Sequence, residues 1–140
     1  MKRAVEGWRA PQGLEGAQAL LALAAHFREA GQAPAAYAQA DDLWSIARHR
    51  AFLARHAQAL AERRGSPQLA AWASEHAAPL ARRWGHIAPL MMQAALALGA
   101  GRAASSSVAD TLEALAALER AAAAAFPSGP ETGASPARLE

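Results

Sequence analysis

Residues 42–64 read DLWSIARHRAFLARHAQALAERR, and this stretch decides the fold class. It contains no Gly or Pro, begins with an acidic residue and ends with two arginines. This charge order suits the helix macrodipole, and apolar residues that return every three or four positions line one face of a helix. We therefore expect one long helix over 42–64. Its expected core stripe is Leu43, Ile46, Leu53, Ala57 and Leu60.

Three further segments, at residues 14–30, 67–98 and 108–126, have helical composition, rich in Ala, Leu, Arg, Gln and Glu. Ser107 is the expected N-cap of the last helix, with Asp110 three residues on. β-Branched residues are scarce, and no stretch alternates apolar and polar residues as a strand does. The predicted fold is all-α, a compact antiparallel bundle of four to five helices with short connections.

Two prolines interrupt the third helical region. A proline inside a helix removes a hydrogen bond and clashes with the preceding turn, so Pro79 and Pro89 predict kinks or breaks. The region should then form two or three pieces. The prolines belong to a weak repeat, HAAPL at 76–80 and HIAPL at 86–90, which indicates two similar kinks or a chance match in a biased composition.

The chain length fits one domain, which we place at residues 1–126. Residues 127–140 are rich in Pro, Gly and Ser and are expected to form a flexible tail, whose removal should leave the thermal stability unchanged. Alanine supplies nearly a third of the chain, so the helices should pack closely around few large side chains. The expected anchors are Phe27, Trp44, Phe52, Trp72 and Trp84.

Several chemistries lack the residues that they need. The chain has no Cys, which excludes disulfides and thiolate metal sites. No two His stand one helical turn apart and no Glu-x-x-His occurs, so we expect no metal site and no cofactor. The letters GAGRAA at 99–104 match a dinucleotide-binding pattern, but no strand precedes them, and they indicate a helix stop. No nucleophile elbow, P-loop or paired-carboxylate motif appears, so we expect no enzyme.

The expected location is the cytoplasm. The N-terminal segment is charged but lacks the apolar stretch of a signal peptide. The longest weakly polar run, residues 87–98, is too short to span a bilayer. We therefore predict no membrane association.

The middle of the chain is basic. Residues 43–102 carry eight arginines and only two acidic residues, between mildly acidic ends. Arginine presents a planar fork that suits phosphate or carboxylate, and Trp44 is interleaved with these arginines. The predicted contact residues for a partner or a nucleic acid are Arg48, Arg50, Arg55, Arg63, Arg64, Arg82, Arg83 and Trp84.

Two details of this basic region stay open at the level of sequence. Arg50 projects toward the apolar side of its helix, so it either extends to solvent, enters an ion pair or meets a partner. His49, Phe52, His56 and Arg63 form a strip beside the apolar face, which indicates either a half-buried boundary or a contact strip.

The function that the sequence favours is a non-enzymatic helical interaction protein, an accessory subunit that binds protein partners in a larger assembly. The alternative is a small subunit of a nucleoprotein complex that contacts RNA or single-stranded DNA through its Arg and Trp side chains. A further alternative is a bundle that holds a small apolar ligand or haem between its helices. Salt dependence separates the first two, because nucleic-acid binding weakens steeply as ionic strength rises.

Overall fold

The computed structural model describes residues 16–37 and 40–127, and it confirms the all-α prediction. The elements in chain order are α1 (Gly16–Ala30), the 3-10 helix η2 (Pro34–Tyr37), α2 (Ala40–Arg64), α3 (Pro67–Trp72), the π-helical turn η3 (Ala73–Ala77), α4 (Ala78–Trp84), α5 (Ile87–Gly99) and α6 (Ser107–Ala125). These described residues contain no strand. Apart from Pro127, the tail expected over residues 127–140 lies outside them.

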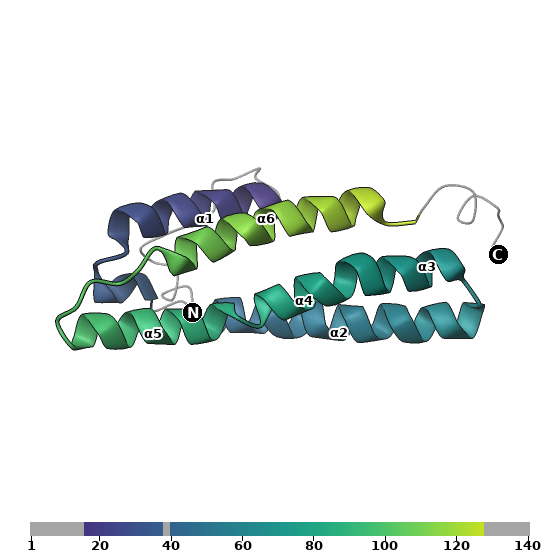
Figure 1. Ribbon diagram of the computed structural model, residues 1–140, viewed down its shortest axis with the longest axis horizontal. Coiled ribbons are helices and arrows are strands. Elements are labelled where there is room, and N and C mark those ends of the chain that lie inside the picture. Colours follow the sequence, from purple (N-terminus) through teal and green to yellow (C-terminus); the bar gives the residue numbers. More distant parts are fainter. Residues whose placement is uncertain (1–15, 38–39, 128–140) are drawn as a thin grey trace.

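The helices form two layers. In Figure 1, α1 and α6 run side by side in one layer, and α2 runs beside α3 and α4 in the other. Helix α5 continues beyond α4 past the start of α2, and α6 then returns beside α1, in contact with α5, α4 and η3. The segments α3, η3, α4 and α5 together form one bent rod, so the described residues form a bundle of four rods.

The first turn of the bent rod follows directly from its sequence. Gly65 adopts φ +60°, and the N–H groups of Gly65 and Ser66 donate to the carbonyls of Glu62 and Ala61. This paired closure is the usual end of a helix at a left-handed glycine. The Ser66 hydroxyl then accepts the Leu69 N–H at 3.1 Å and caps α3.

The GAGRAA stretch ends α5 in the same way. Gly101 adopts φ +80° and donates to the Leu98 carbonyl at 3.0 Å, while the Arg102 N–H donates to the Ala97 carbonyl at 2.8 Å. The reading of these glycines as a helix stop is therefore confirmed.

The two prolines break the rod by different devices. Pro79 follows the π-helical turn, in which the Ala78 N–H reaches back five residues to the Ala73 carbonyl. Pro89 lies in the first turn of α5, where an N–H needs no partner within the helix. Gly85 separates the two pieces. Both copies of the repeat thus mark helix starts, and the prediction of a Pro-kinked third helix is confirmed.

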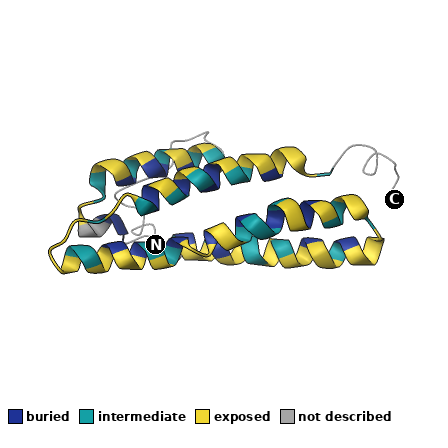
Figure 2. Ribbon diagram, in the orientation of Figure 1, coloured by how far each residue is buried: buried dark blue, intermediate teal, exposed yellow. Residues whose placement is uncertain are grey.

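One core cluster links both layers. Its largest fully buried side chains come from α4, α5 and α6, and Figure 2 shows that the buried residues lie on the faces where the layers meet. Fully buried alanines such as Ala24 and Ala116 let α1 and α6 pack closely. The largest fully buried side chains are Trp84, Ile87, Met91, Val108, Leu112 and Leu115.

Two expected anchors and one residue of the expected core stripe are wrong. Trp44, Phe52 and Leu53 are exposed, whereas Phe27, Trp72 and Trp84 are buried as predicted. On α2 the side chains that face inward follow a strict spacing of four and three residues, so small alanines occupy the seam and aromatic side chains lie outside. The inner seam of α2 consists of Leu43, Ala47, Arg50, Ala54, Ala57 and Ala61.

The expected cap of α6 is also wrong. The N-cap is Ser106 rather than Ser107, and its side chain makes no capping hydrogen bond to the backbone. The Ser106 hydroxyl donates instead to Asp110 at 3.2 Å. The Ser105 hydroxyl accepts the Ser107 N–H at 3.3 Å and so satisfies one backbone donor at the start of the helix.

Within residues 16–37 and 40–127, no helix combines the length and the apolar character that crossing a membrane requires.

Candidate interaction surface

The outer face of α2 carries paired aromatic and basic side chains. Arg48 lies over the ring of Trp44, with 4.6 Å between the guanidinium carbon and the ring centroid. One turn on, Phe52 stacks on His56, with ring centroids 5.7 Å apart and an angle of 8° between the planes. Because these residues follow one another at a spacing of four, they form a continuous ridge along the helix.

The ridge is open to solvent. Trp44 is 50% exposed and Phe52 is 60% exposed, although both are large apolar side chains. Arg48, His49, Phe52 and Arg55 line a shallow depression whose residues all come from α2. We call Trp44, Arg48, Phe52, Arg55 and His56 the α2 ridge.

The charged residues in the central part of α2 are all basic. From Leu43 to Ala61 the sequence holds three arginines and no acidic residue. No ion pair joins Arg48 or Arg55 to an acid within the described part of the chain. The α2 ridge therefore presents positive charge beside aromatic rings, which suits an anionic or aromatic counterpart.

The other predicted arginines do not join the ridge. Arg82 and Arg83 are exposed on α4, where they line a hollow with Pro79, His86 and Leu118 of α6. Arg63 and Arg64 are exposed in the last turn of α2, where basic side chains stabilise the helix C-terminus. The basic block of the sequence is thus divided among separate surfaces.

Arg50 and Trp84 lie in an internal network. The Arg50 Nε donates to a Glu119 carboxylate oxygen at 2.6 Å, and its Nη2 donates to the other oxygen at 3.2 Å. Trp84 is 1% exposed, and its indole N–H donates to the same carboxylate at 2.9 Å. Of the roles left open for Arg50, the structure shows an ion pair, and neither Arg50 nor Trp84 belongs to the α2 ridge.

Sequence reasoning missed Glu119, which holds this network together from α6. It also missed an exposed apolar strip on α5, where Met92 is 62% exposed and Leu96 is 64% exposed. A signal for the strip was present, because the segment 87–99 contains no charged residue. Surface helices ordinarily carry charged residues on their outer face.

A second polar cluster ties α1 to α6 at the surface. The Arg28 Nη2 contacts Asp110 at 2.9 Å and Glu113 at 2.8 Å. The hydrogen bond from Arg28, with another from Ser106, holds the pKa of Asp110 below its ordinary value of 3.8. The same carboxylates raise the pKa of Arg28.

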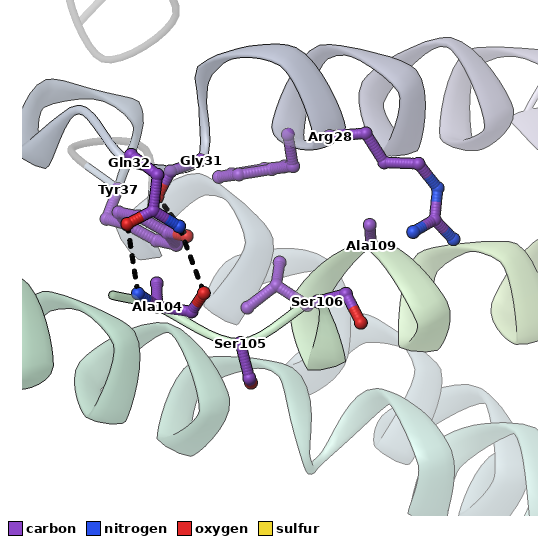
Figure 3. Close-up of a pocket in the computed structure, with 10 residues that line it drawn as sticks. Arg28, Gly31, Gln32, Tyr37, Ala104, Ser105, Ser106 and Ala109 are labelled. Carbon is purple, nitrogen blue, oxygen red and sulfur yellow. Dashed lines mark hydrogen bonds between the residues drawn. The ribbon is translucent and has the colours of Figure 1, made fainter. Parts of the chain in front are cut away.

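A pocket of about 220 Å³ lies beside this cluster (Figure 3). The Gln32 amide clasps the Ala104 backbone, with its Nε2 donating to the carbonyl at 3.0 Å and its Oε1 accepting the N–H at 3.2 Å. The Tyr37 hydroxyl donates to the Gly31 carbonyl at 2.9 Å, and burial raises the Tyr37 pKa. The two hydrogen bonds of Gln32 fasten the turn before α6 to the segment that follows α1.

Metal ligands do not gather in the described part of the chain: no three side chains of His, Asp or Glu come together there. Comparisons with known proteins give no match to a family model, to a curated protein or to a solved structure.

Proposed function

We propose that this protein is a non-enzymatic helical interaction protein, an accessory subunit of a larger assembly, and that a protein partner docks on the α2 ridge. One observation carries the proposal: Trp44 and Phe52 are half or more exposed on a helix whose opposite face is the buried seam. Aromatic residues and Arg are the types enriched at the centres of protein interfaces, where a few of them supply most of the binding energy.

The spacing of the ridge supports docking into a groove. Trp44, Arg48 and Phe52 stand at i, i+4 and i+8, the pattern by which a helix inserts one row of anchors into a partner. The contacts of Trp44 with Arg48 and of Phe52 with His56 also hold the rings in place before binding. Such preorganisation reduces the entropy lost on association.

The test is a paired substitution, read by affinity for the partner that co-purifies from the native host. Trp44→Ala with Phe52→Ala should weaken binding by at least about a hundredfold, since each interface anchor contributes about 2 kcal/mol or more. The matched control is Met92→Ala with Leu96→Ala, which removes two exposed apolar side chains from α5 instead. Circular dichroism checks that both variants remain helical.

Either of two outcomes would contradict docking on the α2 ridge. If the α5 pair abolishes binding and the α2 pair retains it, the docking surface is the α5 strip. If neither pair changes the affinity, the exposed aromatic residues of α2 are not a partner surface.

The second candidate is contact with single-stranded RNA or DNA through the same ridge. The absence of acidic residues from Leu43 to Ala61, together with Arg48 and Arg55 beside exposed rings, favours it. Bases stack on aromatic side chains and phosphates pair with arginine. Arg48→Ala with Arg55→Ala should then reduce the slope of log affinity against log salt concentration, by the amount expected for the loss of about two phosphate contacts. Binding that does not change with salt favours the protein partner.

A further inference from the structure

A hollow lies between α1 and α2, on the side of α2 opposite the ridge. Its volume is about 190 Å³, and nearly all of the surface that lines it is apolar. Leu20 and Leu23 line it from α1, and Leu43 and Ile46 line it from α2.

The arrangement of the layers explains the hollow. Helix α1 packs along α6, whereas α2 packs along α3 and α4, so α1 and α2 do not pack closely against each other. Gly16 and Ala19, which face the hollow from α1, are too small to fill the remaining space. A Cβ atom added at Gly16 would meet no heavy atom within 4 Å.

The polar groups of the hollow belong to the internal network. Arg50, Trp84 and Glu119 line it, and the two charges of the ion pair offset each other. Arg50 uses its Nε and Nη2 on Glu119, and a guanidinium carries five N–H donors. Three of these donors therefore remain for other acceptors, at an apolar site with no net charge.

We propose that this hollow binds a small uncharged molecule, about the size of one aromatic ring, with a single hydrogen-bond acceptor directed at Arg50. The size follows from the volume, because an apolar cavity of about 150 Å³ is known to hold benzene. The absence of charge follows from the offset ion pair, since an unpaired ionic group is costly to bury. The site is separate from the α2 ridge and does not rest on the proposed partner.

The experiment titrates phenol into the full-length chain and follows the methyl groups of Leu20, Leu23, Leu43 and Ile46 by NMR. The expected result is saturable shifts confined to these methyl groups. Benzoate and benzylamine, which carry opposite charges on the same ring, should bind more weakly than phenol. Residues 1–15 precede Gly16 at the rim and are present throughout, so the measured affinity is that of the whole chain.

Two variants on one helix separate the site from general stickiness. Ala19→Trp fills the hollow and should weaken phenol binding by at least about tenfold, because a packed interior has no room for both. Ala25→Trp adds the same side chain at an exposed position of α1 and should leave the affinity within about twofold. The methyl shifts of the unaltered chain decide the matter if the first variant does not fold.

Absence of saturable shifts in the unaltered chain would overturn the proposal. So would equal phenol binding by the two tryptophan variants. Tighter binding of benzoate or benzylamine would show that the ion pair does not offset its charges toward a ligand, and would overturn the uncharged class.

Discussion

The two faces of α2 carry large side chains with opposite roles. On the inner face, Arg50 joins Glu119 and Trp84 in a network that three helices build together. On the outer face, Arg48 lies over the ring of Trp44, and both side chains are exposed. The inner face therefore affects stability, and the outer face is available for recognition at little cost to the fold.

The ion pairs of Arg50 and of Arg28 differ in burial. Arg50 and Glu119 meet where α2, α4 and α6 converge, and their side chains are 31% and 17% exposed. The pairs of Arg28 with Asp110 and Glu113 stand at the surface, more exposed on both sides. Exposed pairs contribute little because water screens them, whereas breaking a largely buried pair leaves a costly unpaired charge.

The largest expected difference is between two tryptophans. Trp84→Ala should lower the free energy of unfolding by about 3–5 kcal/mol, because it empties a fully buried site. Trp44→Ala should lower it by less than about 1 kcal/mol, as for other exposed positions. Urea denaturation of both variants measures the contrast. Equal losses would mean that the outer face also supports the fold.

A smaller contrast concerns two glutamates. Glu119→Ala should cost about 2–3 kcal/mol, since it leaves Arg50 and the Trp84 N–H without their shared acceptor and the site is partly solvated. Glu62→Ala, on the exposed end of α2, should cost less than about 0.5 kcal/mol. Replacing both Arg50 and Glu119 by leucine should recover part of the loss. A double variant no more stable than Glu119→Ala would argue against a charge effect.

The surface ion pair of Arg28 with Asp110 should make the thermal stability depend on pH. The pKa of Asp110 is depressed in the folded state, so its contribution to stability is present above the ordinary value of 3.8 and is lost as pH falls through the folded value. The difference in Tm between the protein and its Asp110→Asn variant should thus be largest near neutral pH and vanish in acid. High salt should shrink it at every pH. A difference that grows on acidification would contradict the assignment.

The smallest effect is expected at Arg82 and Arg83. Their joint replacement by alanine should change the free energy of unfolding by less than about 0.5 kcal/mol, because both are exposed and pair with no acid in the described part of the chain. Thermal denaturation and circular dichroism measure this. The same variant tested for partner or oligonucleotide binding shows whether this second arginine surface takes part in recognition.

Sequence patterns were sufficient for the helices and for most of their ends, although not for the cap of α6. Gly65 and Gly101 stand where a left-handed residue must close a helix, and Pro79 and Pro89 stand where a regular helix cannot continue. These signals are local, so a single sequence carries them.

Local sequence patterns do not determine which face of α2 is buried. Hydrophobicity favours Leu53 and Phe52 for the core of α2, but the partner rod approaches so closely that Ala54, Ala57 and Ala61 occupy the seam. Likewise Arg50 could be placed on the inner side, whereas its partner Glu119 lies 69 residues away on another helix. The approach of two helices and the pairing of residues far apart in the sequence depend on how the rods assemble. The periodicity of a single helix contains no information on either.

The π-helical turn at Ala73–Ala77 changes the direction in which the side chains before it point relative to those after it along the bent rod. Twelve residues separate Trp72 from Trp84, and in a regular α-helix they would point about 120° apart. The wide turn absorbs one residue, which leaves about 20° between them. Both indole N–H groups can then donate to α6, one to the Ala122 carbonyl and the other to Glu119. A chain that lacks the exposed Ser74 would keep this alignment with an ordinary helix, whereas one extra residue would rotate Trp72 out of the bundle.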